Sequence, residues 1–244
     1  TTPDGEESLK FCINTLNIAA IKIGSSELNN YDFLKEISMC NRDVILSTGM
    51  GSFKEISKAI NIFKKNLNKK KDLYILQCTS EYPTPLESVN LNAMIEIKKK
   101  YKFQVGLSDH SEGNIASLLA CANDAKIIEK HFTINKNMKG PDHKASLDPN
   151  ELYNFISDIR KIPIVMGNKV KKPTLNELKN LPNVRRGVVA KKKIKKGTIL
   201  NKYLLTCKRP FIEIQPSEIK YLYNKKILID LDEDQPIKWK YIDD

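Results

Sequence analysis

The sequence has few of the features that mark membrane, secreted or disordered proteins. No segment comes near the roughly 18 consecutive apolar residues that a membrane-spanning helix needs. The first seven residues, Thr-Thr-Pro-Asp-Gly-Glu-Glu, contain neither a basic nor an apolar stretch, which predicts no signal peptide. Hydrophobic residues make up 41% of the chain and charged residues 29%, and this globular mixture excludes disorder and collagen-like structure.

Cysteine and arginine are also scarce. The five cysteines are an odd number with no Cys-x-x-Cys pair, which favours reduced thiols in a cytoplasm over a disulfide scaffold. Only five of the 41 basic residues are arginine, whereas nucleic-acid readers favour arginine for its two-pronged hydrogen bonding. The net charge of +12 therefore comes mainly from lysine, and this abundance of lysine is typical of the codon bias of an AT-rich genome. We expect neither a nucleic acid nor a membrane as a partner.

Short apolar segments alternate with amphipathic segments through residue 161. Strands are predicted at 19–24, 43–49, 73–78, 104–108 and 126–132, and helices at 8–17, 31–39, 52–65, 90–100, 114–123 and 150–161. This alternation predicts α/β units with a parallel sheet. A closed (β/α)₈ barrel has eight strands in about 250 residues. The alternatives are therefore an open five-stranded sheet or a TIM-type barrel that lacks its first three units.

The pattern changes after residue 162. Residues 163–183 contain three prolines and no long apolar segment, which predicts a linker between a domain at 1–162 and a second domain at 184–244. The second domain has short strand-like segments and is predicted to be small and β-rich. Its lysine run at 191–196 is interpreted as a solvated surface.

Polar side chains follow each predicted strand. Because the carboxyl ends of parallel strands lie at the same edge of a sheet, these side chains should line one common site there. His110 and His131 end neighbouring strands and are candidate ligands for a divalent metal, the alternative being two structural histidines. Lys22 indicates an anion site or a strand-end lysine that reaches solvent, and Glu129 an acid/base group or a partner of Lys130. The other strand ends carry Ser25, Ser47, Thr48, Gln77, Thr79, Ser80 and Tyr82.

Six segments together resemble the sialic acid synthases, which condense phosphoenolpyruvate with an amino sugar to nonulosonic acids. The resemblance continues into a C-terminal antifreeze-like (SAF) domain through Arg185-Arg186, Lys195-Lys196-Gly197 and Lys208-Arg209-Pro210. The six segments are Lys22-Ile-Gly-Ser-Ser-Glu27, Leu46-Ser-Thr-Gly-Met50, Gln77-Cys-Thr-Ser-Glu-Tyr-Pro83, Gly106-Leu-Ser-Asp-His-Ser111, Glu129-Lys-His-Phe-Thr133 and Gly140-Pro-Asp-His143.

The resemblance implies a role for each matching residue. His110 and His131 match the metal ligands, usually for Mn²⁺, with Mg²⁺ or Co²⁺ as alternatives. Glu129 matches a carboxylate at the reacting centre, and Arg209 an arginine that reaches the sugar from the partner subunit of a domain-swapped homodimer. The cradle for phosphoenolpyruvate is matched by Lys22, Ser25, Ser47 and Ser108. Contacts to an N-acylmannosamine-type sugar are matched by Glu27, Thr79, Ser80, Tyr82 and Asp142.

The sequence also departs from the family pattern. A Glu-Ile-Gly-x-Asn-His motif and a further lysine of the family are not found, so we expect an N-terminally truncated chain without the first three βα units. Ser80 stands where an asparagine is common, Gly187 where a serine is, and Phe211 where glycine or threonine is. Residues 140–147 are more similar to sialic and legionaminic than to pseudaminic acid synthases. We expect a synthase, with an inactive fragment or binding module of the same fold as the alternative.

Overall fold

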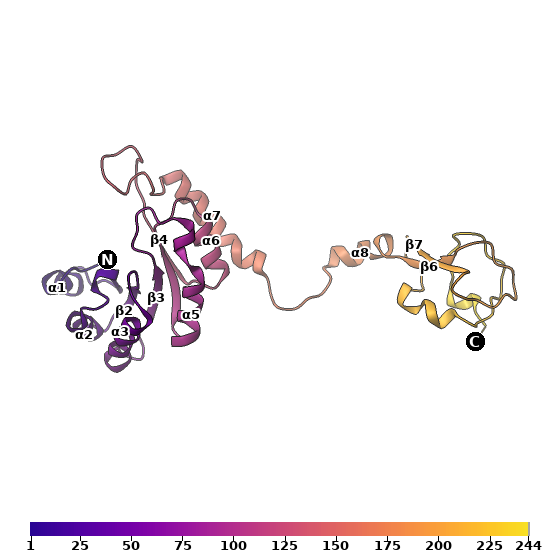
Figure 1. Ribbon diagram of the computed structural model, residues 1–244, viewed down its shortest axis with the longest axis horizontal. Coiled ribbons are helices and arrows are strands. Elements are labelled where there is room, and N and C mark those ends of the chain that lie inside the picture. Colours follow the sequence, from indigo (N-terminus) through magenta and orange to yellow (C-terminus); the bar gives the residue numbers. More distant parts are fainter. Residues whose placement is uncertain (244) are drawn as a thin grey trace. The chain divides into compact units, whose positions relative to one another are not determined.

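The computed structural model describes residues 1–243, and the chain divides into two compact units, Thr1–Asn168 and Lys169–Asp244. Unit 1 contains a five-stranded parallel sheet whose spatial order follows the chain order (Figure 1). All five predicted strands are confirmed, with ends that differ by a few residues. They are β1 (Ala20–Ile23), β2 (Asp43–Ser47), β3 (Leu73–Cys78), β4 (Gln104–Asp109) and β5 (Ile127–Lys130).

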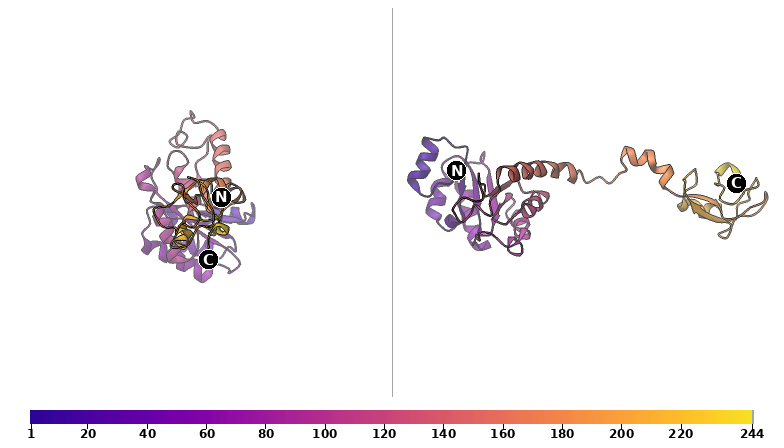
Figure 2. Two further views of the ribbon diagram at one scale, coloured as in Figure 1. Left: turned by 90° about the vertical axis from the view of Figure 1, so that its right-hand side faces the viewer. Right: turned by 90° about the horizontal axis from the view of Figure 1, so that it is seen from above.

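Helices connect these strands and cover one side of the sheet. Helices α5, α6 and α7 lie together beside β3 and β4 in Figure 1, and α7 extends beyond the rest of unit 1 in Figure 2. The helical elements are α1 (Glu6–Asn14), η1 (Ser25–Glu27), α2 (Tyr31–Ser38), α3 (Phe53–Asn66), α4 (Leu86–Val89), α5 (Leu91–Tyr101), α6 (Ile115–Ala122) and α7 (Pro149–Met166).

Local sequence signals account for where the main helices start. Helix α3 begins at a capping box, in which Ser52 and Glu55 bond to each other's backbone N–H groups. Its buried residues, spaced three or four apart, form one face against the sheet: Ile56, Ala59, Ile60 and Phe63. Asp148 and Glu151 form the same box at the start of α7.

Alternation along the strands separates the core from a polar face. Ile23, Leu46, Ile75 and Leu107 are buried in the core against the helices. Successive side chains of a strand point to opposite faces. The neighbouring residues, which include Lys22, Ser47, Ser108 and Glu129, therefore lie on the other face of the sheet.

The segment that follows the sheet is more helical than its prolines indicate. Helix α7 was predicted to end at residue 161 but continues through Pro163 to Met166, and Gly167 follows it with a φ of 59°. Helix α8 (Leu175–Val184), capped by Thr174, lies inside the segment predicted as a linker and has no buried residue. Among residues 1–243, no helix combines the length and apolarity required to cross a membrane.

Unit 2 has its own apolar core and little regular structure. Strands β6 (Gly187–Ala190) and β7 (Leu205–Lys208) pair antiparallel, and isolated bridges with the short helices η2 (Pro216–Leu222) and η3 (Trp239–Tyr241) complete it. Val188, Leu200 and Ile227 are among its buried residues. Lysines of the basic segment are exposed and pair with an acidic segment, as in Lys195–Asp230 at 2.9 Å. Such exposed pairs contribute little to stability.

A prediction about stability comes from Gly106 in β4. A Cβ atom at this position would lie 2.3 Å from the Ile127 carbonyl oxygen and 2.5 Å from a Leu76 methyl carbon. We expect Gly106→Ala to lower the free energy of unfolding by about 1–3 kcal/mol, because the strands must move to admit the methyl group. Urea unfolding followed by circular dichroism measures this change.

The matched control is Gly24→Ala. Gly24 has a φ of −67°, and the atom nearest to an added Cβ would be the Ser26 Oγ at 3.5 Å. We expect a change within about 1 kcal/mol, because alanine accepts this backbone conformation. Equal destabilisation by the two substitutions would contradict the packing described here.

Candidate functional site

One end of the concave polar face is built by residues from three strands. Lys22 Nζ of β1 lies 3.3 Å from Glu129 Oε2 of β5, and Ser108 Oγ of β4 donates to Glu129 Oε1 at 2.6 Å. In a flat sheet, strands four places apart would be separated by about 19 Å. The contact between β1 and β5 therefore shows that the sheet is strongly curved, with these side chains inside the curve.

Two imidazole rings lie next to this carboxylate. His110 and His131 have ring centroids 5.5 Å apart and planes nearly perpendicular. His110 Nδ1 donates to the Thr79 carbonyl oxygen at 2.8 Å, which leaves the lone pair on Nε2. That Nε2 atom is 3.3 Å from Ser108 Oγ, whose single hydrogen is donated to Glu129, so Ser108 lies between His110 and Glu129.

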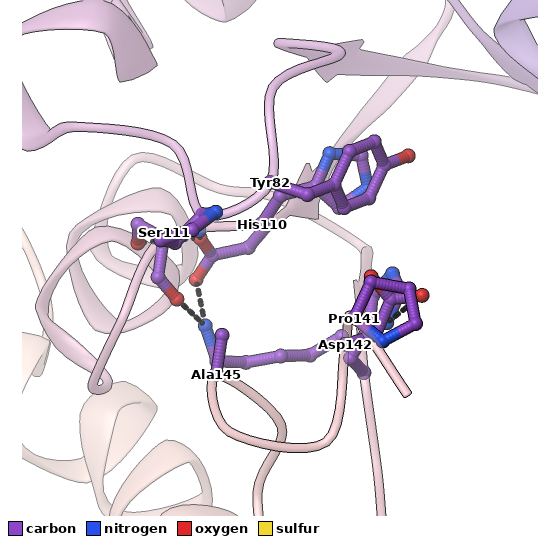
Figure 3. A pocket seen from close by; sticks show the side chains of 10 residues that line it. Tyr82, His110, Ser111, Pro141, Asp142 and Ala145 are labelled. Atoms are coloured by element: carbon purple, nitrogen blue, oxygen red, sulfur yellow. Dashed lines mark hydrogen bonds and ion pairs between the residues drawn. The ribbon is translucent and has the colours of Figure 1, made fainter. Parts of the chain in front are cut away.

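An aromatic ring and an acidic loop border the histidine pair. Tyr82 stacks on His110 with ring centroids 4.1 Å apart and presents its edge to His131 (Figure 3). Asp142, from the loop before α7, places a carboxylate oxygen 3.7 Å from His131 Nδ1. Figure 3 shows Pro141 and Asp142 across the pocket from Ser111. The wall of this pocket therefore combines aromatic, acidic and imidazole groups.

Burial changes the acid–base behaviour of two of these groups. Burial lowers the pKa of His110 below its ordinary value and outweighs the Thr79 carbonyl, which acts in the opposite direction. Burial also raises the pKa of the Tyr82 hydroxyl, and the nearby Cys78 and Asp142 act in the same direction. At neutral pH the site therefore presents a neutral imidazole and a protonated phenol.

A third group of residues forms a tight polar corner after β2 and β3. The Gly49 N–H donates to Ser25 Oγ at 2.9 Å, and Ser25 Oγ donates to Cys78 Sγ at 3.5 Å. A Cβ atom at Gly49 would lie 2.2 Å from Ser80 Oγ, so this close approach requires glycine. Cys78, which is 7% exposed, is thus part of the corner.

Ser47 carries the clearest sign of an absent ligand. Its side chain is 2% exposed, and its hydroxyl has no hydrogen-bond partner. Buried hydroxyl groups are almost always satisfied, and an unpaired one costs free energy. Ser47 lies on the same face of the sheet as Lys22 and Ser108, so its hydroxyl belongs to the concave polar face.

Two of the predicted site residues direct their side chains to other partners, and a third belongs to unit 2. Glu27 accepts a hydrogen bond from Asn30 Nδ2 at 2.8 Å and lines a separate acidic hollow with Asp32. The Thr79 hydroxyl donates to the Ser88 carbonyl at 2.8 Å, so Thr79 meets the site through its own carbonyl, on His110. Arg209 belongs to unit 2, where it is exposed.

The site also contains a charged pair that the sequence did not indicate. Asp109 and Lys130, each directly before a site histidine, form a buried ion pair at 2.9 Å. Burial alone would raise the pKa of Asp109, but hydrogen bonds from Ser111 and Ser117 and the charge of Lys130 bring it below its ordinary value. The sequence feature that could have indicated this pair is the position of Asp109 and Lys130 directly beside His110 and His131 in two of the matched segments.

The histidine pair fits part of a metal coordination sphere. His110 presents a neutral Nε2 atom while its other nitrogen donates to a carbonyl, the arrangement typical of metal-bound imidazoles. Within residues 1–243 no group of three or more His, Cys, Asp or Glu side chains is arranged to hold a metal ion. His110 and His131 would therefore supply two ligands, with the other positions open to substrate or water.

Residues 1–171 match the model of the NeuB family, and residues 185–242 match the SAF domain. The chain belongs to the NeuB family. The small second unit is therefore the SAF domain that the sequence predicted, and the five strands with their helices form the half-barrel of this family's α/β fold.

Several curated relatives have names within one class of enzyme. The chain is 47% identical over 86% of its length to N,N'-diacetyllegionaminic acid synthase of Campylobacter jejuni and 36% identical over 98% to the enzyme of that name from Legionella pneumophila. It is 34% identical over 95% to human N-acetylneuraminate-9-phosphate synthase. The chain spans 63%, 67% and 64% of these relatives, respectively.

Solved structures agree with this assignment. A crystal structure of N-acetylneuraminic acid (sialic acid) synthetase from Leptospira borgpetersenii, in complex with citrate, matches with a TM-score of 0.67 and 34% identity. The match covers 73% of this chain and 61% of that one. A spore coat polysaccharide biosynthesis protein E from Chromobacterium violaceum, at 23% identity and a TM-score of 0.73, covers all of this chain and supports the fold alone.

The environment of His110 predicts its titration. Because burial lowers the pKa of His110, we expect the ring to protonate only below its ordinary value of about 6.5 and to be neutral at pH 7. Tyr82→Ala uncovers the ring and should move the pKa back towards that value. Histidine-selective NMR over pH 4–9 (roughly the range in which imidazoles titrate) measures both, in the absence of metal.

Tyr153→Ala serves as the control, because Tyr153 in α7 is 77% exposed. It should leave the titration of His110 unchanged. A His110 ring that protonates at or above its ordinary pKa in the parent protein would contradict the buried, carbonyl-bonded arrangement.

Proposed function

We propose that the protein condenses phosphoenolpyruvate with an N-acylmannosamine-type sugar to give a nonulosonic acid and phosphate. The observation that carries this proposal is the concave face of the half-barrel. There a lysine and a buried unpaired hydroxyl, Lys22 and Ser47, lie on the same face as a carboxylate that is linked to an imidazole pair. Relatives named as sialic-type acid synthases support it.

Phosphoenolpyruvate would bind at the Lys22 end of the face. Its phosphate and carboxylate are anionic and need cationic and hydroxyl donors, which form the stronger class of hydrogen bond. Lys22 supplies the cation, and the hydroxyls of Ser25, Ser47 and Ser108 supply donors. Lys22 is 3.3 Å from Glu129 without substrate, so the arriving dianion would compete with this carboxylate for the ammonium group.

The amino sugar would bind at the other end of the face. Tyr82, with its hydroxyl protonated at neutral pH, and Asp142 are placed to contact sugar hydroxyls and the acylamino group. Ser80 lies in the corner beside Ser25, between the two proposed subsites. The two substrates would thus be held side by side, which removes much of the entropic cost of their meeting.

We further propose that His110 and His131 hold a divalent metal, Mn²⁺ in the first instance and Mg²⁺ or Co²⁺ as alternatives. When bound there, the ion supplies Lewis acidity to the open-chain aldehyde of the sugar. His110 is suited to this because burial keeps its imidazole neutral and the Thr79 carbonyl fixes its orientation.

The reaction would proceed by carbon–carbon bond formation followed by loss of phosphate. C3 of phosphoenolpyruvate attacks the aldehyde carbon, the aldehyde oxygen takes up a proton, and C2 becomes electron-poor. Water adds to C2 and gives up one proton, which balances the proton taken by the aldehyde oxygen. The C2–O bond to phosphate then breaks while the new C2 hydroxyl becomes the product carbonyl and passes its remaining proton to the departing phosphate. Glu129 is placed to hold or move a proton, because Ser108 connects it to His110 and Lys22 balances its charge.

Within the substrate class, we propose the 2,4-diacetamido-trideoxy sugar that leads to N,N'-diacetyllegionaminic acid. The support is the set of relatives, since proteins named for that product are 47% and 36% identical to this chain. N-acetylmannosamine is the competing substrate. We also propose a homodimer in which Arg209 of a second copy contacts the acylamino group of the sugar.

The activity test uses the full-length protein with both substrates. We expect phosphate release only when phosphoenolpyruvate, an amino sugar and Mn²⁺ are all present, and loss of release on adding EDTA. The diacetamido sugar should give a higher kcat/KM than N-acetylmannosamine. If phosphoenolpyruvate binds but no phosphate is released in the presence of either sugar, the protein is instead a binding module of the same fold.

Ser47→Ala separates a ligand-binding hydroxyl from a structural one. The substitution removes an unpaired buried hydroxyl, so we expect thermal stability to be unchanged or slightly higher. We expect the KM for phosphoenolpyruvate to rise about tenfold, the equivalent of roughly 1.4 kcal/mol, as for the loss of a hydrogen bond to a charged group.

Ser57→Ala is the control for this substitution. Ser57 lies in α3, where its hydroxyl contacts Tyr101 and the Phe53 carbonyl. It should leave the KM unchanged. A Ser47→Ala protein that is less stable and has an unaltered KM would show that this hydroxyl serves the fold.

A further inference from the structure

A buried ion pair lies directly beside the two site histidines. Asp109 precedes His110 and Lys130 precedes His131, and the Asp109 and Lys130 side chains are 0% and 5% exposed. Alternation along β4 and β5 places them on the other side of the strands from Ser108 and Glu129. Both residues line the same pocket as the two histidines, and their side chains are almost completely buried.

Both members of the pair are hydrogen-bonded to neighbouring groups. Asp109 Oδ1 accepts from the Ser111 N–H at 2.9 Å and from its hydroxyl at 2.6 Å. Asp109 Oδ2 accepts from the Ser117 hydroxyl at 2.6 Å and from Lys130 Nζ at 2.9 Å. Lys130 Nζ also donates to the Ser111 carbonyl at 2.7 Å. These bonds join the ends of β4 and β5, the loop that follows β4, and α6.

The pair occupies the place where the backbone ladder between the two strands ends. Asp109 and Lys130 are the last residues paired across β4 and β5. Beyond them the backbones diverge, because the His110 carbonyl accepts from Thr84 and the His131 carbonyl from Leu147. The ion pair is thus a side-chain bond that ties the two strands together one residue before each histidine.

Stability alone is a weak reason for two buried charges. Replacing a buried ion pair with apolar residues of similar volume is often neutral or stabilising, because desolvation offsets the attraction. A fixed geometry is a stronger reason, since a metal or substrate site tolerates only small displacements of the groups that contact it.

We propose that Asp109 and Lys130 are positioning residues that set the spacing and orientation of His110 and His131 by locking together the ends of β4 and β5. Neither touches the substrate. Their effect on metal binding rests on the proposed function, whereas their effect on the geometry of the two rings does not.

The test removes both charges so that neither is left buried alone. Asp109→Asn/Lys130→Met keeps the volumes similar and retains an amide that can bond to Ser111 and Ser117. The matched control is Lys98→Met/Asp124→Asn, which removes an exposed ion pair. Both variants are made in the full-length protein.

The first measurement is histidine-selective NMR without metal. The sequence has three histidines, so three sets of ring signals are expected from this chain. We expect the signals of His110 and His131 to shift or broaden in the Asp109/Lys130 variant. The signals of His143, whose ring bonds to the Thr133 hydroxyl, should not change. The Lys98/Asp124 variant should leave all three unchanged.

The second measurement is the affinity for Mn²⁺ alone, from electron paramagnetic resonance of the free ion. Loss of an outer-shell partner typically weakens metal affinity by about 10- to 100-fold, and we expect at least tenfold here. Unchanged ring signals and unchanged Mn²⁺ affinity in a folded variant would overturn the proposal and leave only a structural role.

The two proposals fail in different ways. If the parent protein does not bind Mn²⁺, the metal part of the proposed function is wrong, and the ring signals still decide the role of the ion pair. If the double variant does not fold, Ser117→Ala removes one bond to Asp109 and keeps both charges. It should displace the same two sets of signals to a smaller extent, and an unchanged spectrum would overturn the proposal.

Discussion

The curvature that brings β1 and β5 face to face is the constraint on which the site depends. Lys22 and Glu129 lie on the first and the fifth strand of the sheet order, and their charged groups are nevertheless 3.3 Å apart. Only a half-barrel puts these strands within reach of each other. The same curvature directs Ser47 and Ser108 towards a common space, so the proposed phosphoenolpyruvate subsite is a property of the sheet as a whole.

The strands that build the core also build the site, because alternate residues face opposite ways. In β1, Ile21 and Ile23 are buried in the core and Lys22 lies between them on the polar face. Ser47, with a buried and unpaired hydroxyl, shows what this arrangement costs in the absence of a ligand. Asp109 and Lys130, on the helix side, are instead bonded to each other and to neighbouring groups, in keeping with a supporting role behind the site.

Much of the fold could be predicted from the sequence, since apolar segments of about six residues specify buried parallel strands without reference to distant residues. The capping boxes of α3 and α7 also depend only on residues close together in the sequence. The continuation of α7 through Pro163 was not, because a proline signals an end and only the structure shows the helix continuing. The polar strand ends indicated the site, whereas the place of Cys78 beside Ser25 and the Asp109–Lys130 bond depend on contacts between strands.

The measurement that tests the central claim most directly is the crystal structure of the full-length protein with Mn²⁺ and phosphoenolpyruvate, using the anomalous signal of manganese. The account predicts a manganese peak within coordination distance of His110 and His131. It also predicts phosphoenolpyruvate on the concave face, with its phosphate or carboxylate bonded to Lys22 and Ser47. Manganese bound away from the two histidines, or phosphoenolpyruvate bound outside the concave face, would contradict it.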